Sequence, residues 1–240
     1  MRKILILMLG LLTFGALLTF TSNASAKNND VKLRVFEHFP KGQPVATSNC
    51  TPTTNPIPND FGLAGWQMPV KGMSYKINYS SEPSNLSNTA VQNVVANSFG
   101  TWSTADSKQI FKYDGATSAK TAKFDGTNAI LWKPITSSAI AITYIWYYSS
   151  THVVVETDTV FNSRYQWSVN TPSSGDCAGQ AGTYDLQNIG THEFGHWIGL
   201  DDLYKTADKD LTMYGYGELG ELKKDTLGKG DITGVNAILP

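Results

Sequence analysis

Apolar side chains along the middle of the chain follow the spacing of β-strands. Several runs are rich in β-branched and aromatic residues and predict strands: residues 73–79, 128–133, 140–148 and 153–162. Phe111 opens a further short strand, and the dipeptides Asp114-Gly115 and Asp125-Gly126 predict turns. These runs together predict a sheet.

Two stretches have the spacing of amphipathic helices instead. Their apolar residues are Val91, Val94, Val95, Phe99 and Trp102 in the first, and Leu186, Phe194, Trp197 and Ile198 in the second. Asn88 or Thr89 can cap the first helix. In the second, the apolar residues fall within an arc of roughly 120°. Asp185 is a suitable N-cap there, and Gly199 stands where that helix would end in a left-handed turn.

The N-terminal part of the chain lacks this regular pattern. Arg2 and Lys3 precede an apolar run that ends near Phe20, and residues 23–26 read Asn-Ala-Ser-Ala. This predicts a secretory signal peptide, residues 1–26, cleaved after Ala26; for an uncleaved membrane anchor the run is barely long enough. Residues 27–62 carry several prolines among Asn and Thr and predict an extended arm or short prosegment. Residues 63–240 are then expected to form one domain.

Charge narrows the class of partner. The formal net charge of the chain is −1, and removal of residues 1–26 changes it to −3 because two basic and no acidic residues are lost. No basic block remains that could contact nucleic acid or an anionic membrane. Because the signal peptide is expected to be cleaved and no other apolar stretch is long enough to span a bilayer, we expect an exported, soluble monomer that acts outside the cell.

The second helix carries the candidate chemistry. His192 and His196 are four residues apart and lie about 40° apart on the side opposite the apolar arc, so both imidazoles can bind one zinc ion. After the helix, Asp202 can supply an oxygen ligand, with Asp201 as the alternative. Two imidazoles and one carboxylate leave a position open for water. Glu193 can then serve as the base that activates the zinc-bound water.

Residues 192–202 resemble the extended zinc motif of the metzincin metallopeptidases, H-E-x-x-H-x-x-G-x-x-H/D. Aspartate replaces the usual histidine in the last position, and in this the motif resembles that of the small snapalysin-type bacterial enzymes. Residues 211–215, around Met213, resemble the Met-turn beneath the metal in that clan, and residues 226–235 are similar to the closing helix of matrixins. The resemblance implies an α+β fold: a twisted, mostly parallel sheet with an antiparallel edge strand, an active-site helix and a C-terminal helix.

The same resemblance implies a secreted bacterial zinc endopeptidase that cleaves proteins or peptides paired along an edge strand, residues 140–148. A covered core strand is the alternative for these residues, because composition alone does not distinguish the two. The alternative function is a metal-binding or adhesion protein on this scaffold without turnover, which would have no need of Glu193. A gluzincin peptidase would instead take Glu218 or Glu221 as third ligand. Whether Tyr214 or Tyr216 stabilises the oxyanion stays open.

Two cysteines, Cys50 and Cys177, in an exported chain predict one disulfide. The alternative is that Cys50 caps the metal in a latent form, as the propeptide cysteine of many matrixins does. The matrixin propeptide motif is absent around Cys50.

A second metal is not expected. Matrixins commonly carry a structural zinc bound by several histidines, and only His38 and His152 remain here. Asp158 and Asn162 lie where the resemblance suggests calcium, but no loop has a pattern of oxygen ligands that predicts it.

Overall fold

A computed structural model describes residues 30–41, 59–106, 109–170 and 179–238. A seven-stranded sheet has the order β11-β1-β6-β7-β5-β3-β4. Its strands are β1 (Val31–Pro40), β3 (Met73–Ile77), β4 (Phe111–Ala116), β5 (Ala129–Lys133), β6 (Ala141–Tyr148), β7 (Val154–Asn162) and β11 (Tyr216–Gly217). Strands β4, β3, β5 and β7 are parallel, and β6 is antiparallel to both β7 and β1. The predicted α+β fold class with a mostly parallel sheet is confirmed.

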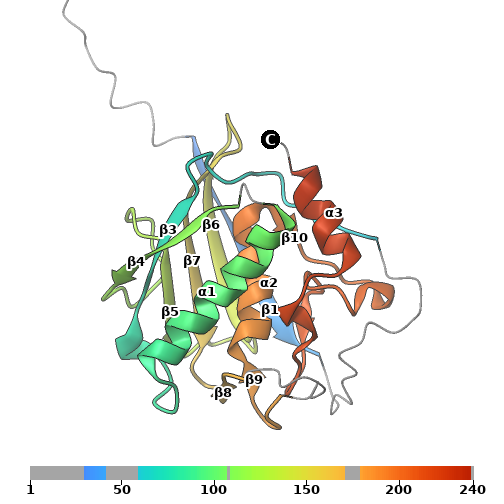
Figure 1. Ribbon diagram of the computed structural model, residues 1–240. Coiled ribbons are helices and arrows are strands. Elements are labelled where there is room, and N and C mark those ends of the chain that lie inside the picture. The colour runs from blue at the N-terminus through green and yellow to red at the C-terminus, as the bar shows by residue number, and fades with distance from the viewer. Residues whose placement is uncertain (1–29, 42–58, 107–108, 171–178, 239–240) are drawn as a thin grey trace, which may run out of the picture.

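Three α-helices complete the fold: α1 (Asn88–Ala105), α2 (Leu186–Ile198) and α3 (Lys229–Ala237). Helices α1 and α2 lie side by side across one face of the sheet (Figure 1). Phe99 of α1 stacks on Phe194 of α2 with ring centroids 3.8 Å apart, and the Trp102 indole donates to the carbonyl of Thr191 at 2.8 Å. These contacts hold α2 against α1 on this face of the sheet.

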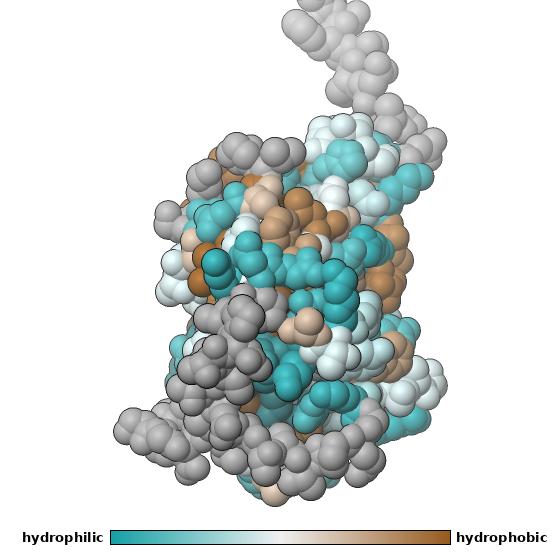
Figure 2. All heavy atoms as spheres, turned by 90° about the vertical axis from the view of Figure 1, so that its right-hand side faces the viewer, coloured by the Kyte–Doolittle hydropathy of each residue, from teal (hydrophilic) through white to brown (hydrophobic). Residues whose placement is uncertain are grey.

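Short elements connect these layers. β10 (Leu200–Asp201) pairs with β2 (Gly62–Leu63), and β8 (Trp167–Ser168) pairs with β9 (Tyr184–Asp185). Single 3₁₀ turns span Tyr79–Ser81, Thr206–Asp208 and Lys223–Asp225. Seen from the α3 side, hydrophilic residues form most of the coloured surface, with smaller hydrophobic patches among them (Figure 2).

Two local predictions are wrong. The N-cap of α1 is Ser87, not Asn88 or Thr89, because Ser87 has extended backbone angles and its side chain accepts a hydrogen bond from the amide of Ala90. The Asp114-Gly115 dipeptide is not a turn but part of β4. Its pairing with β3 shifts register there, and Gly115, at φ 90°, accommodates the irregularity.

The strand expected at the sheet edge, β6, is covered on its outer side by β1. Val31 pairs with Tyr148 and His38 with Ala141, in antiparallel register. On its other side, the end of β1 pairs in parallel with β11. The sequence predicts an extended arm or short prosegment over residues 27–62. It does not indicate the pairing of this arm with the sheet, because the prolines conceal the short alternation that buries Phe36 and His38.

Some predictions fall outside the described residues: the signal peptide, residues 1–26, and the pairing of Cys50 with Cys177. Within the described part of the chain, no helix has the length and apolar character needed to cross a bilayer.

Candidate metal centre

Helix α2 begins and ends as its sequence predicts. The Asp185 side chain accepts a hydrogen bond from the amide of Asn188 at 2.9 Å. At the other end Gly199 has φ 128°, and a side chain there would overlap the carbonyl of Trp66. This turn brings the residues after the helix back beside its imidazoles.

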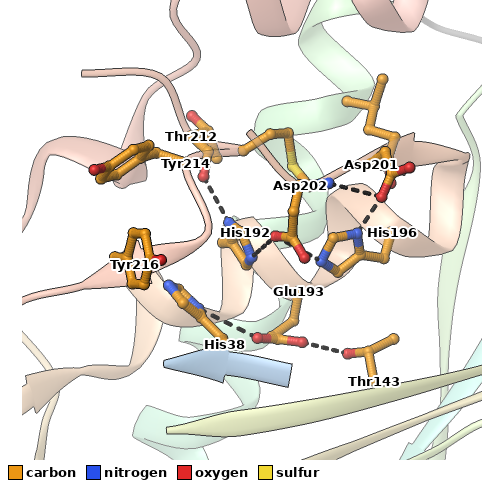
Figure 3. Close-up of polar contacts among 12 residues, drawn as sticks. His38, Thr143, His192, Glu193, His196, Asp201, Asp202, Thr212, Tyr214 and Tyr216 are labelled. Carbon is orange, nitrogen blue, oxygen red and sulfur yellow. Dashed lines mark hydrogen bonds and ion pairs between the residues drawn. The ribbon is translucent and has the colours of Figure 1, made fainter. Parts of the chain in front are cut away.

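The three predicted ligands meet in one group (Figure 3). Asp202 Oδ1 lies 3.2 Å from His192 Nε2 and 3.6 Å from His196 Nε2. The two imidazole rings are nearly perpendicular, with centroids 5.0 Å apart. All three side chains are at least nine-tenths buried.

Hydrogen bonds fix the direction of the imidazole lone pairs. His192 Nδ1 donates to the carbonyl of Thr212 at 2.8 Å, and His196 Nδ1 donates to the carbonyl of Leu200 at 2.9 Å. The Nε2 atoms therefore present lone pairs towards Asp202. Buried His192 Nε2 and Asp202 Oδ1 have no hydrogen-bond partner. Two buried acceptors that face each other are stabilised by a cation between them, and this donor set suits zinc.

The two neighbouring aspartates have different partners. Asp202 Oδ2 accepts a hydrogen bond from the Tyr204 hydroxyl at 3.1 Å. Asp201 instead accepts two hydrogen bonds from the Arg34 guanidinium, at 2.9 and 2.8 Å. The geometry thus places Asp202, and not Asp201, beside the two imidazoles.

Glu193 is fully buried beside this group. Its Oε2 accepts a hydrogen bond from the Thr143 hydroxyl at 2.5 Å, and its Oε1 lies 3.3 Å from Nδ1 of His38. Burial raises the pKa of Glu193 to about 8, although the hydrogen bond from Thr143 opposes the rise. A carboxyl with this pKa can both accept and release a proton near neutral pH.

Met213 lies directly beneath α2. A side chain at Gly195 would overlap Met213 Sδ, so this glycine allows the close approach of turn and helix. The amides of Thr212 and Met213 donate to the carboxylate of Asp231 in α3, at 2.8 and 3.1 Å. The C-terminal helix therefore holds the turn in place.

Strand β1 covers the ligand group. The Phe36 ring stacks on His196, and the His38 ring lies on His192, each pair with centroids 3.9 Å apart. His38 Nε2 also contacts the ammonium of Lys224, at 3.0 Å. Burial lowers the pKa of Lys224 to about 8, while Glu221 opposes this shift.

The sequence did not identify His38, Thr143, Tyr204 or Lys224 as parts of the site. For His38, its place in an alternating stretch of the arm is a sequence feature that could have indicated a buried role.

Other candidate groups lie apart from the ligands. Glu218 pairs with Lys41 at 2.9 Å and Glu221 with Lys223 at 2.8 Å. His152 lies in a loop, where its Nδ1 donates to the carbonyl of Gly65 at 2.7 Å.

The residues considered for calcium have internal partners. Asp158 accepts hydrogen bonds from the amides of Lys123 and Ala129. Asn162 bonds the main chain at Ile135, Ala139 and Arg164. The rings of Tyr214 and Tyr216 contact each other, and their carbonyls accept hydrogen bonds from Lys224. The Tyr216 ring also contacts the Tyr204 ring, and the Lys41 ammonium lies over the Tyr214 ring.

Comparison with known proteins agrees with this arrangement. The sequence profile of the matrixin peptidases matches residues 66–239, a range that contains the three predicted ligands, Glu193 and Met213. Strand β1 precedes the matched range. No curated protein matches the chain.

Proposed function

Because the chain belongs to the matrixin family, we propose that it is a zinc-dependent endopeptidase whose metal is held by His192, His196 and Asp202. One observation carries the proposal: the buried, unpartnered Nε2 of His192 faces the unpartnered Oδ1 of Asp202 at 3.2 Å. Bound zinc would supply a Lewis acid that polarises a carbonyl and acidifies water.

Glu193 acts as general base in this proposal. It accepts the proton of the attacking water and later gives it to the leaving amine. The Thr143 hydroxyl orients the carboxylate through its hydrogen bond to Oε2. The raised pKa of Glu193, about 8, suits a group that performs both transfers.

The substrate is a protein or peptide in extended form, paired along the outer edge of β6. That edge runs past Thr143, which contacts Glu193. We also propose that the protein is exported, on the grounds of the charged, apolar and A-x-A pattern of residues 1–26.

A metal-binding protein without turnover is the second candidate. The buried contact between Glu193 and Thr143 disfavours it, because binding alone requires neither a carboxylate there nor a donor to orient it.

Metal analysis and a peptide-library digest test the proposal. We expect about one zinc per chain and loss of hydrolysis on chelation. Since β1 covers the ligands, hydrolysis is measured on the intact chain and on a Phe36→Asp variant, in which a carboxylate replaces the ring on His196.

Glu193→Gln in the same background is the matched variant. It retains zinc and loses turnover by about 10²-fold or more, because the amide cannot accept the proton. Full hydrolysis by metal-free protein, or unchanged hydrolysis by Glu193→Gln, would exclude the mechanism.

A further inference from the structure

Strand β1 lies in a groove made by two other segments. It pairs antiparallel with β6 along Val31 to His38, and in parallel with β11 at Phe39 and Pro40. An extended segment with partners on both sides has the arrangement by which a strand-like peptide binds a sheet edge. The blue strand in Figure 1 occupies this position.

Side chains of β1 also close the metal group to solvent. His192, Glu193 and His196 are each at most 1% exposed. Phe36 and His38 alternate with residues that point away, such as Val35, which is 42% exposed. A peptide substrate therefore cannot reach Glu193 while β1 is in place.

The His38 ring is surrounded by polar side chains of the site. It lies on the His192 ring, beside the Glu193 carboxylate and against the Lys224 ammonium (Figure 3 shows the first two). Gly217 leaves room for it, since a side chain there would approach His38 Nε2 to 3.2 Å. The backbone between Phe36 and His38 crosses the metal group, so a residue in the His38 place adjoins the reacting peptide bond.

The Lys224 ammonium has three N–H donors, and main-chain carbonyls accept hydrogen bonds from two of them. The ammonium donates to the carbonyl of Tyr214 at 2.6 Å and to that of Tyr216 at 2.9 Å. The third contact is His38 Nε2, at 3.0 Å. When β1 leaves, this third donor loses its partner.

We propose that β1 holds the place of the substrate in a latent form, and that Lys224 selects a peptide side chain that accepts a hydrogen bond at the place of His38. The favoured side chains are the carboxylate of Glu and the amide of Gln. The latent role rests on the proposed peptidase function, and the side-chain preference deepens it by naming the substrate class.

The preference follows from the cost of a buried donor without a partner. An apolar side chain such as Met or Leu would fill the His38 place and leave the third donor of the buried Lys224 ammonium without a partner, which is unfavourable. Sites built to hydrogen-bond a substrate reject analogues that lack the bonding group more strongly than apolar pockets reject small changes of size. A divalent cation on the ligands would offset the negative charge of Glu193 and Asp202, so that a carboxylate is accepted as well as an amide.

Substitutions within β1 test its latent role. Phe36→Asp places a carboxylate against the His196 ring, whereas the matched control Val35→Asp makes the same kind of change on the exposed side. We expect Phe36→Asp to raise peptide hydrolysis by at least about tenfold and to speed amide hydrogen exchange in β6, since β1 protects that edge. Equal hydrolysis and exchange in the two variants would overturn the latent role.

Peptides added to the full-length Phe36→Asp chain test the preference. The probe is a fluorescent peptide of residues 30–41, displaced by unlabelled copies in which the His38 position is Glu, Gln, Met or Leu. We expect the Glu and Gln peptides to compete at least about tenfold better than Met and Leu. Met or Leu competing as well as Gln would overturn the assignment to Lys224.

Binding is measured on the zinc-loaded double variant Phe36→Asp, Glu193→Gln, so that no peptide is cut. Binding in the expected order without hydrolysis by the zinc-loaded Phe36→Asp chain that retains Glu193 would exclude the peptidase and leave the peptide site intact. If circular dichroism shows that Phe36→Asp is unfolded, Phe36→Ser takes its place in both experiments.

Discussion

The carboxylates of Asp201 and Asp202 belong to consecutive residues but face different partners. Asp201 accepts two hydrogen bonds from the Arg34 guanidinium, whereas Asp202 Oδ1 lies 3.2 Å from His192 Nε2. In an extended segment, consecutive side chains point to opposite sides. The turn at Gly199 therefore decides which of the two aspartates reaches the imidazoles.

Substitution of each aspartate separates these roles. We predict that Asp202→Ala sharply lowers zinc affinity, while Asp201→Ala leaves it within a few-fold of the parent, because only Asp202 joins the ligand group. Asp202→His retains zinc, since imidazole is an equivalent ligand. Zinc affinity is measured by competition with a chelator. Equal losses in the two alanine variants would contradict the assignment.

The metal group could be predicted because its geometry is local. His192, Glu193 and His196 share one helix, and Asp185 and Gly199 set its ends within the same stretch. The periodicity of residues 129–133, 141–148 and 154–162 likewise located the central strands to within a residue. Each of these inferences depends on neighbours in the chain.

The cover on the site could not be predicted because it depends on distant pairing. His38 contacts Lys224 across 186 residues, and nothing near either one indicates the other. Lys224 follows Lys223 in a polar stretch that is typical of an exposed turn, yet it is fully buried. Only the register of β1 on β6 and β11 brings these side chains together.

The hydrogen bond from Thr143 to Glu193 predicts a change in the pH dependence of hydrolysis. This bond lowers the pKa of Glu193 against the larger effect of burial. Thr143→Val removes the donor at similar volume, so the pKa of Glu193 rises and the carboxylate forms only at higher pH. With the Phe36→Asp chain as the parent, we expect the acidic limb of kcat/KM against pH to move to higher pH.

Thr143→Ser is the matched control, because it keeps the hydroxyl and loses only a methyl group. Its acidic limb should stay close to that of the parent. A Val variant with an unmoved limb and lower kcat at every pH would show that Thr143 serves only to position Glu193.

Replacement of Gly195 by a larger residue is predicted to lower the stability of the fold. An alanine side chain there would overlap Met213 Sδ and lie 2.8 Å from Trp102 Cζ2. Although alanine favours helices, overpacking typically costs about 1–3 kcal/mol, so Gly195→Ala should lower the free energy of unfolding. Urea denaturation measures it. Gly100→Ala in α1, with no atom within 4 Å, should stabilise by up to about 1 kcal/mol; the same gain at Gly195 would contradict the tight contact.

Asp158 predicts how stability changes with pH. Its carboxylate accepts hydrogen bonds from the amides of Lys123 and Ala129, both at 2.8 Å, but burial outweighs them and raises its pKa from 3.8 to about 7. The folded state thus holds the proton to a higher pH than the unfolded state does. The stability that this proton contributes is fully present below about pH 4 and is lost as the pH rises through about 7.

Asp158→Asn isolates this effect, because the asparagine does not titrate and other groups cancel when the two proteins are compared. The amide loses one acceptor, so the variant is less stable at pH 5. Between pH 5 and 8 the parent should lose on the order of 3 kcal/mol more unfolding free energy than the variant, from about 1.36 kcal/mol per unit of pKa. Urea denaturation at each pH provides the measurement. Curves that stay parallel across this range would show that Asp158 ionises in the folded protein at its ordinary pKa, and that its two main-chain donors outweigh its burial.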